Sequence, residues 1–167
     1  ILLLWHLIRL DILMSADQEY PAAMALDQAG YSYVCGSTFS SAQESNYILI
    51  KYDLSGDTVW SRQHNGNING EDECNGIAID NQSNVLITGR SESNTGYDIF
   101  TIKYSSSGDV LWSKRYNGLG NGSNNAYSVA TDDSLNVYIA GRIQTSANVY
   151  AIALIKYNMS GVLQWAK

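Results

Sequence analysis

Residues 76–112 read GIAIDNQSNVLITGRSESNTGYDIFTIKYSSSGDVLW, and this stretch decides the fold. Short apolar runs alternate with clusters of Asn, Ser, Gly and Asp, the residues that favour tight turns. The 3.6-residue period of an amphipathic helix is missing from this stretch. We therefore expect four short strands, over 76–79, 84–89, 97–104 and 109–116.

The same pattern occurs three times along the chain. Four anchors return every 52 or 53 residues: an Asp that begins a turn, a Gly that ends a strand, a Lys that precedes a Tyr, and a Trp four residues after a Gly. A fixed period of this length indicates a repeat architecture. The anchors are Asp27, Asp80 and Asp132, Gly36, Gly89 and Gly141, Lys51, Lys103 and Lys156, and Trp60, Trp112 and Trp165. The other two copies predict strands over 22–26, 31–36, 47–53 and 57–62, and over 127–131, 136–141, 150–157 and 162–167.

The third strand of each copy indicates how the repeats are arranged. In the second copy, Ile99 and Thr101 face one way while Phe100 and Ile102 face the other. A sheet with one face in water would alternate apolar and polar residues, so this strand must be covered on both sides. Four-stranded sheets stacked face to face provide that cover, as in a β-propeller. The alternative is a β-solenoid, whose rungs are usually about 20 to 30 residues long.

The predicted fold class is therefore all-β: a β-propeller fragment of three four-stranded antiparallel blades and a partial N-terminal strand. Residues 1–19 are expected to be the remnant of a preceding blade, because Trp5 lies 55 residues before Trp60. Both ends look cut, and three blades are too few to close a ring. We expect further blades of the same chain or an association between chains. The three blades are predicted at 20–66, 73–118 and 126–167, the last one truncated at the C-terminus.

Composition and charge exclude some functions. The net charge is −6, and only ten Lys and Arg residues are spread along 167 residues. A nucleic-acid binder needs clustered basic residues to displace phosphate counterions, so we predict no nucleic-acid partner. The apolar run at 1–8 is too short and too interrupted by charge to span a bilayer, which predicts no transmembrane segment there. Cys35 and Cys74 could form a disulfide, but two small buried thiols are the favoured interpretation.

The repeat resembles the SBBP repeat, a β-propeller repeat of bacterial and archaeal surface or secreted proteins. The resemblance covers residues 20–167 and is carried by GIAID at 76–80, NVLITG at 84–89, IKY at 102–104 and SGDVLW at 107–112. The first copy departs from the pattern, with Cys35 in place of a threonine. The resemblance implies a secreted or cell-surface location and no fixed activity. The Gly-x-x-x-Trp pieces also resemble the repeats of pyrroloquinoline-quinone enzymes.

The recurring anchors are interpreted as structural. Tryptophans at one repeat position are expected to pack between blades rather than to form an exposed sugar platform. Each recurring Asp begins the turn between the first two strands, where its carboxylate accepts backbone amide hydrogen bonds. The recurring Lys ends the third strand on the same side of the blade, so an ion pair between the Lys and the Asp of one blade is favoured over catalysis.

The opposite end of the blades is the predicted binding face. The connections between the second and third strands, and between one blade and the next, differ most among the copies. Loops on a rigid scaffold usually carry binding. These connections are predicted as long loops over 37–46, 90–96, 142–148, 64–75 and 117–125. The candidate ligand-binding residues in them are Glu44, Asn46, Asn67, Asn69, Glu92, Asn94 and Asn121.

One connection, NGNINGEDE at 65–73, resembles the start of a calcium loop because oxygen side chains alternate before a glycine. The candidate ligands would be Asn65, Asn67, Asn69 and Glu71. The first position is Asn instead of Asp, and Gly76 stands where the bidentate Glu belongs, so a solvated acidic turn is favoured. Calcium stays an open alternative, and no other cofactor is predicted.

No catalytic residues are assigned, because the sequence shows no HExxH motif, nucleophile elbow or credible triad. We predict a non-enzymatic surface or secreted scaffold or binding module that contacts a protein or glycan through the two sets of variable connections. One alternative is part of a polysaccharide-active enzyme whose catalytic residues lie outside these 167 residues. The other is a structural, surface-layer-like protein.

Overall fold

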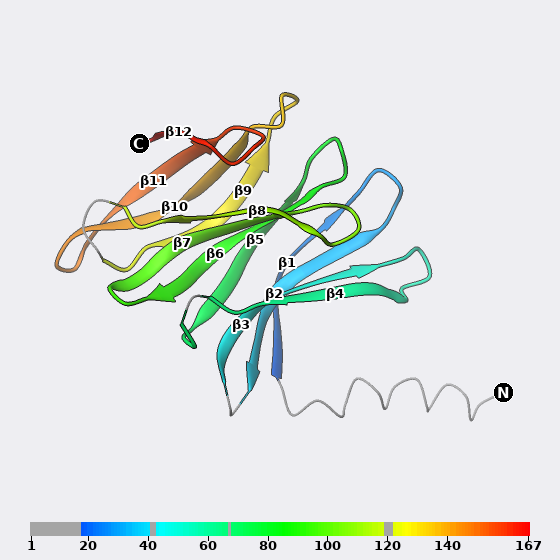
Figure 1. The fold of residues 1–167 in the computed structure, drawn as a ribbon, viewed down its shortest axis with the longest axis horizontal. Coiled ribbons are helices and arrows are strands. Elements are labelled where there is room, and N and C mark those ends of the chain that lie inside the picture. The colour runs from blue at the N-terminus through cyan, green and yellow to red at the C-terminus, as the bar shows by residue number, and fades with distance from the viewer. Residues whose placement is uncertain (1–17, 41–42, 67, 119–121) are drawn as a thin grey trace.

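The computed structural model describes residues 18–40, 43–66, 68–118 and 122–167. Within these residues the chain forms twelve β-strands and no helix, arranged as three separate four-stranded antiparallel sheets. Each sheet is an up-and-down meander in which every strand pairs with the next one in the sequence. We call the sheets blades 1, 2 and 3, and they follow one another from blue to red in Figure 1.

All twelve predicted strands are present, and the first strand of each blade begins two to four residues earlier than predicted. Blade 1 contains β1 (Gln18–Leu26), β2 (Ser32–Ser40), β3 (Gln43–Tyr52) and β4 (Thr58–His64). Blade 2 contains β5 (Asp72–Ile79), β6 (Val85–Ser93), β7 (Gly96–Tyr104) and β8 (Val110–Tyr116). Blade 3 contains β9 (Asn125–Thr131), β10 (Val137–Ser146), β11 (Val149–Tyr157) and β12 (Leu163–Ala166).

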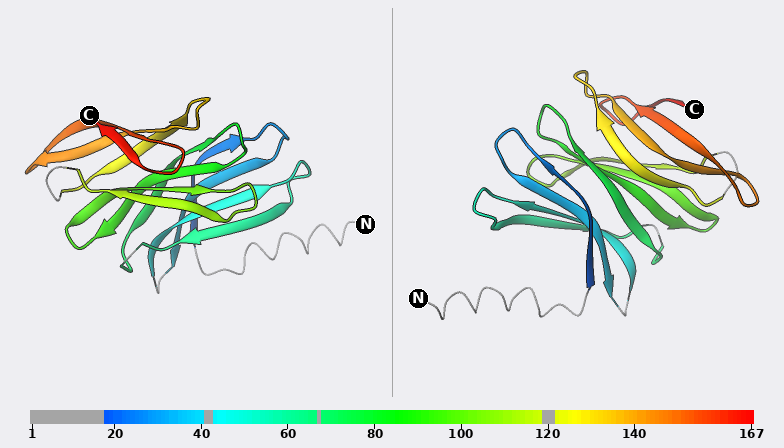
Figure 2. Two further views of the ribbon diagram at one scale, coloured as in Figure 1. Left: turned by 45° about the horizontal axis from the view of Figure 1, so that its top comes forward. Right: turned by 180° about the vertical axis from the view of Figure 1, so that it is seen from behind.

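The blades stack face to face around their first strands. β1 contacts β5, and β5 contacts β9, so the three first strands lie next to one another. β5 also lies against β2 and β3 of blade 1, and β9 lies against β6 and β7 of blade 2. Both views in Figure 2 show the three sheets fanned in sequence order. This arrangement confirms the predicted stack of propeller blades.

Two hydrophobic cores lie between the blades. The first joins Tyr47 and Leu49 of blade 1 to Phe100 and Ile102 of blade 2. The second joins blade 2 to blade 3 and includes Ile99. Strand β7 therefore buries one side chain row against blade 1 and the other towards blade 3, as its two apolar faces predict. We call the face that contacts the following blade the forward face, and the opposite one the backward face.

The tryptophans of blades 1 and 2 connect neighbouring blades, which confirms their predicted packing role. Trp60 Nε1 donates to the carbonyl oxygen of Ser106 in blade 2 at 3.3 Å. Trp112 Nε1 donates to the carbonyl oxygen of Met159, the equivalent residue of blade 3, at 3.0 Å. The Trp112 ring also lies 6.1 Å from the ring of Tyr157. Each indole thus fixes the turn between the third and fourth strands of the next blade.

The recurring glycines lie where the first strand of each blade bulges towards the second. A Cβ atom at Gly36, Gly89 or Gly141 would overlap the carbonyl oxygen of Tyr20, Glu73 or Asn125, respectively. The register of the first strand shifts at or next to each of these sites. The repeat therefore requires glycine because a backbone carbonyl occupies the space of a side chain.

The recurring Asp side chains hold the turns after the first strands. Asp80 Oδ1 accepts from the backbone amides of Gln82 and Asn84, each at 2.9 Å. Asp27 and Asp132 accept equivalent pairs of amides in the other blades. The predicted turn role of these carboxylates is confirmed.

The Lys–Asp ion pair is confirmed in one blade and wrong in two. Lys103 Nζ lies 2.8 Å from Asp80 Oδ2, with both side chains almost fully buried. In blade 1, Tyr33 donates its hydroxyl to Asp27, and Lys51 lies over the tyrosine ring instead. In blade 3, Tyr138 occupies the same place between Asp132 and Lys156. Blade 2 has Leu86 at this repeat position, which leaves the carboxylate oxygen to the lysine.

Several sequence boundaries need correction. The connections over 37–46, 90–96 and 142–148 are largely strand, because β2–β3, β6–β7 and β10–β11 continue to tight turns. The expected long loops are therefore wrong at these three places. β1 begins at Gln18, so Gln18 and Glu19 belong to blade 1 and not to the remnant. Residues 1–17, with the predicted strand at Trp5, lie outside the described residues.

Cys35 and Cys74 are both free and buried in the first core, which confirms the prediction of two buried thiols. In the described part of the chain, no helix is long and apolar enough to cross a membrane.

Candidate functional site

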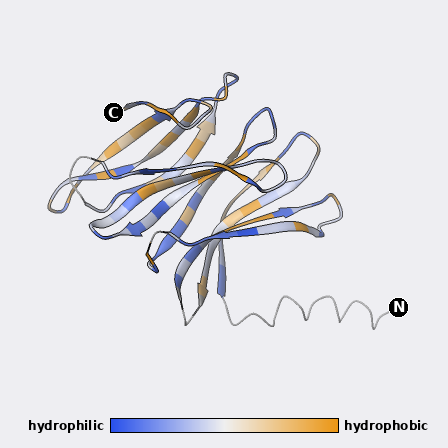
Figure 3. Cartoon of the chain, in the orientation of Figure 1, coloured by the Kyte–Doolittle hydropathy of each residue, from blue (hydrophilic) through white to orange (hydrophobic). Residues whose placement is uncertain are grey.

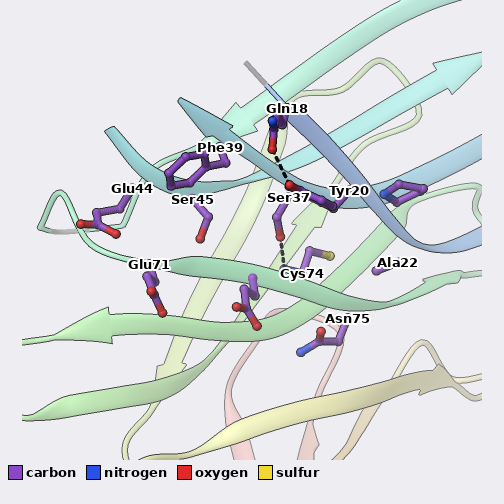
Figure 4. Close-up of a pocket in the computed structure, with 12 residues that line it drawn as sticks. Gln18, Tyr20, Ala22, Ser37, Phe39, Glu44, Ser45, Glu71, Cys74 and Asn75 are labelled. Carbon is purple, nitrogen blue, oxygen red and sulfur yellow. Dashed lines mark hydrogen bonds between the residues drawn. The ribbon is translucent and has the colours of Figure 1, made fainter. Parts of the chain in front are cut away.

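A cavity of about 470 Å³ lies between blades 1 and 2, at the end that carries the strand 2–3 and inter-blade connections. Its walls come from β1, β2 and β3 of blade 1 and from the start of β5 in blade 2 (Figure 4). The cavity thus lies on the face that the sequence predicts for binding. The turns with the Asp anchors lie at the other end of the blades.

Three carboxylates line this cavity: Glu44 from β3, Glu71 directly before β5, and Glu73 near the start of β5. Glu44 is exposed, and the side chains of Glu71 and Glu73 are 42% and 40% exposed. All three can therefore reach a ligand from water. They give the cavity a strongly acidic wall.

One guanidinium organises two of the carboxylates. Arg90 Nη2 lies 2.6 Å from Glu73 Oε1 and 3.2 Å from Glu71 Oε2. Burial lowers the pKa of Arg90, but the hydrogen bond and charge of Glu73 outweigh this and raise the pKa above its ordinary value. A single positive charge thus faces two negative ones, and Glu44 adds a third.

Tyr97 completes this arrangement. Its hydroxyl donates to Glu71 Oε2 at 2.7 Å, and its ring lies 4.3 Å from the Arg90 guanidinium carbon. Burial, followed by the hydrogen bond to Glu71, raises the pKa of Tyr97 to about 12. The phenol therefore remains a donor at neutral pH and holds Glu71 in place.

Aromatic side chains form the other wall. Tyr20 of β1 and Phe39 of β2 line the cavity with 57% and 45% of their surface exposed. The Tyr20 hydroxyl donates to Gln18 Oε1, as Figure 4 shows. Ser37 Oγ accepts from the backbone amide of Cys74 at 3.2 Å and joins the two blades at this point. Exposed aromatic faces beside carboxylates can bind cationic groups and can also stack against flat ligands.

A buried polar cluster fixes the connection from blade 1 to blade 2 behind this wall. Asp72 Oδ2 accepts from the backbone amide of Gly66 at 2.6 Å. Arg115 donates to Asp98 Oδ2 at 3.1 Å and to Ser91 Oγ at 2.8 Å. Burial raises the pKa of Asp72, although hydrogen bonds from Ser91 and Gly66 oppose this shift. The cluster holds β5, and with it Glu71 and Glu73, in position.

Of the residues predicted to bind a ligand, Glu44 is the one that the structure places in the cavity wall, and the other described ones lie elsewhere. Glu44 lines the cavity. Asn46 is buried, Asn69 is exposed and accepts from Asn65 Nδ2, and Glu92 accepts from the Glu71 amide at 2.9 Å. Asn94 is exposed at the turn between β6 and β7. Asn67 and Asn121 lie outside the described residues.

The sequence interpretation missed Tyr20, Phe39 and Glu73. One signal was present: the position of Tyr20 carries Glu73 in the second copy and Asn125 in the third, although the anchors around it recur. Variation at one position of an otherwise regular strand indicates a surface that is free to differ between blades.

The calcium candidates show a different arrangement from a calcium loop. Glu71 is engaged by Arg90 and Tyr97, and Asn65 donates to Asn69. Among the described residues, no group of three or more His, Cys, Asp and Glu side chains could hold a metal ion. Calcium binding remains an untested alternative.

Two comparisons with known proteins bear on this fold. The model of the SBBP family, a beta-propeller repeat, matches residues 59–97, which run from β4 of blade 1 into β7 of blade 2. An uncharacterized WD repeat-containing protein of Acanthamoeba polyphaga mimivirus is 30% identical over 125 residues, covering 64% of this chain. The chain spans only 9% of that relative's length. With three repeated four-stranded sheets, the match at 59–97 identifies an SBBP β-propeller repeat in this chain.

Proposed function

We propose that this chain is part of a non-enzymatic, secreted or cell-surface β-propeller that binds a protein ligand at the cavity between blades 1 and 2. The observation that carries the proposal is the pairing of an acidic wall, Glu44, Glu71 and Glu73, with the exposed aromatic rings of Tyr20 and Phe39. The location outside the cell rests on the SBBP resemblance.

The charge of the cavity favours a ligand with Lys or Arg side chains. Arg90 balances one of the three carboxylates, so the wall keeps a net negative charge. A guanidinium or ammonium of the ligand could pair with Glu44 while the aliphatic stem of the same side chain lies on the Phe39 ring. An exposed segment of a basic protein fits these features better than a neutral glycan, which would use the aromatic rings alone.

A direct test measures binding of the chain to an array of peptides and glycans, followed by affinity measurement for the peptides that bind. We expect Lys- and Arg-containing peptides to bind more tightly than their neutral counterparts, with affinity that falls as salt rises. Glu44→Gln should weaken this binding about tenfold, the loss of one charge-assisted contact.

The matched control is Asp57→Asn, which makes the same charge change on an exposed side chain at the opposite end of blade 1. It should leave the affinity unchanged. Equal losses for the two variants would show that only overall charge matters. Preferential binding of glycans that depends on Phe39 but not on Glu44 would replace the protein ligand with a carbohydrate.

A further inference from the structure

The two cysteines lie on opposite sides of the interface between blades 1 and 2. Cys35 is on β2, on the forward face of blade 1, and Cys74 is on β5, on the backward face of blade 2. Figure 3 shows apolar segments on the strands of both blades, and the core between them includes both cysteines. Cys35 is 0% exposed and Cys74 is 2% exposed. Both are free thiols in the structure, and each faces the neighbouring blade.

Two hydrogen bonds place the cysteine side chains next to each other. The backbone amide of Cys74 donates to Ser37 Oγ at 3.2 Å, as Figure 4 shows. Ser37 lies two residues after Cys35 on β2, so the two side chains project from the same face of the strand. The Cys74 thiol also takes part in a hydrogen bond with Cys35 itself. The strands β2 and β5 therefore meet where both thiols point into the interface.

The equivalent positions of the next interface hold no thiol. Counted from the glycine anchors, Thr88 of β6 is equivalent to Cys35, and Ala126 of β9 is equivalent to Cys74. Strand β6 contacts β9 as β2 contacts β5, and Ala126 is fully buried. Two facing positions thus carry cysteine together in one interface and carry Thr and Ala in the other. A covalent link needs such a paired change, whereas an adjustment of core size does not.

We propose that Cys35 and Cys74 are a site of disulfide formation, and that the bond joins blade 1 covalently to blade 2. The oxidant is a low-molecular-weight disulfide, for which oxidised glutathione serves as the probe. One cysteine thiolate attacks the oxidant and releases a first glutathione, which leaves a mixed disulfide that the second thiolate attacks to release the other. The cysteines lose two protons and two electrons, and the oxidant is reduced to two thiols. This inference is independent of ligand binding.

Burial determines when this exchange takes place. Burial, followed by the hydrogen bond and charge of Cys35, raises the pKa of the Cys74 thiol well above its ordinary value. The reactive thiolate is therefore scarce in the folded chain, and both thiols are closed to an oxidant from water. Exchange thus takes place while blades 1 and 2 are apart, and folding then brings the two thiols together.

The bond stabilises the folded chain because it restricts the unfolded one. Cys35 and Cys74 lie 39 positions apart, so the bond closes a long segment. By linkage, the factor by which the bond lowers the unfolding equilibrium constant equals the factor by which folding favours the oxidised pair over the reduced pair. Cys74 also lines the cavity, so the bond ties this part of the cavity wall to β2.

The test is refolding of the chain from urea in a buffer of reduced and oxidised glutathione, followed by acid quenching, alkylation of free thiols and peptide mass mapping. We expect the peptides that contain Cys35 and Cys74 to be recovered as one cross-linked species. With urea retained in the same buffer, the equilibrium constant for forming the bond should be at least about tenfold smaller. The unfolding equilibrium constant of the oxidised chain should lie below that of the reduced chain by the same factor.

Two variants separate the bond from the packing of the side chains. Cys74→Ala introduces the residue that blade 3 has at this position, Ala126, and Cys35→Ala introduces the equivalent of Ala140. Each variant should fold and should gain no stability from the oxidant, because a single thiol remains. The unmodified chain should gain stability under the same conditions.

Three outcomes would overturn the proposal. Recovery of two separately alkylated peptides after refolding with the oxidant would show that the thiols do not come within bonding distance. Glutathione attached to either cysteine without a link between the two would have the same meaning. A link between two different chains, or one that lowers the stability of the folded chain, would show that the bond does not fit this interface.

Discussion

At the scale of single residues, the repeat position of Tyr33, Leu86 and Tyr138 determines whether the lysine of a blade forms an ion pair or a contact with an aromatic ring. With Leu86 at this position, Lys103 reaches the buried carboxylate of Asp80. With Tyr33 or Tyr138 there, the phenol bonds to the Asp and the lysine lies over the ring. Burial raises the pKa of Asp80, but hydrogen bonds from Lys103 and Asn84 outweigh it, so the pKa lies below its ordinary value. The ion pair thus stabilises the fold above the ordinary Asp pKa of about 4, and this contribution is lost as pH falls through the lower folded value.

Removing one partner of this ion pair should be costly. Asp80→Asn leaves the Lys103 ammonium buried without a charge partner and should lower the free energy of unfolding by about 3–5 kcal/mol. Asp27→Asn is the matched control, because Asp27 bonds to a tyrosine hydroxyl, and its loss should be about 1 kcal/mol. Urea unfolding of both variants measures the difference. Equal losses would contradict a special role for the ion pair.

His64 predicts a dependence of stability on pH. Its ring stacks on Phe100 at 4.9 Å, and burial lowers its pKa, with Arg115 adding to the shift and Asp72 opposing it. In the unfolded chain His64 therefore takes up a proton near pH 6.5, whereas in the folded chain it takes up this proton only at a lower pH. The contribution of neutral His64 to the free energy of unfolding is therefore complete above pH 6.5. It is lost as the pH falls from 6.5 towards the lower pKa of the folded chain. His64→Gln should flatten the decline in urea midpoint between about pH 7.5 and 5.5, and identical pH profiles would refute this origin.

At the scale of the element, the bulge of each first strand determines where the blade requires glycine. The carbonyl oxygen of Glu73 occupies the place of a Cβ atom at Gly89. The same relation recurs in blades 1 and 3. A contact between two backbones cannot be relieved by rotating a side chain, so any larger residue must displace the strand.

Gly89→Ala should therefore destabilise the protein by about 1–3 kcal/mol, as expected when a methyl group is forced into a packed site. The control is Ser113→Ala, an exposed position on β8 of the same blade, which should change stability by less than about 0.5 kcal/mol. Thermal unfolding followed by circular dichroism compares the two. A Gly89→Ala chain as stable as the control would mean that the first strand moves at little cost.

At the scale of the whole molecule, stability comes from contacts between blades rather than from one central core. Each of the two cores draws its side chains from two neighbouring blades. A repeat of this kind is stabilised by its nearest neighbours, so identical positions differ according to whether a neighbour is present.

This view predicts that equivalent residues of different blades contribute very different amounts to the free energy of unfolding. Ile99→Ala removes a buried side chain between blades 2 and 3 and should cost about 2–5 kcal/mol. Ile152→Ala changes a side chain that is largely in water, and its cost should stay below about 0.5 kcal/mol. Denaturant unfolding at concentrations below any association measures both. Similar costs would show that Ile152 is covered within the single chain.

The fold was predictable from the repetition in the sequence, because the same residues pack and turn at the same positions of each blade. The four strands β5 to β8 follow from one copy, although β5 begins at Asp72 and β6 ends at Ser93, each four residues beyond the predicted bound. Trp60 and Trp112 were assigned to inter-blade packing from their spacing alone. The strand 2–3 connections were less predictable. Residues 142–146 look like a polar loop, yet their backbones pair across a hairpin, since backbone hydrogen bonds do not depend on side chain polarity.

The sequence by itself determined the blade, its period and the apolar character of both its faces, because these depend on local alternation repeated three times. Only the tertiary structure decided that Tyr20 and Phe39 of blade 1 share a cavity with Glu71 and Glu73 of blade 2. It also decided which Lys meets its Asp directly. Both depend on side chains that meet across strands or blades, and such distances are set by packing rather than by spacing along the chain.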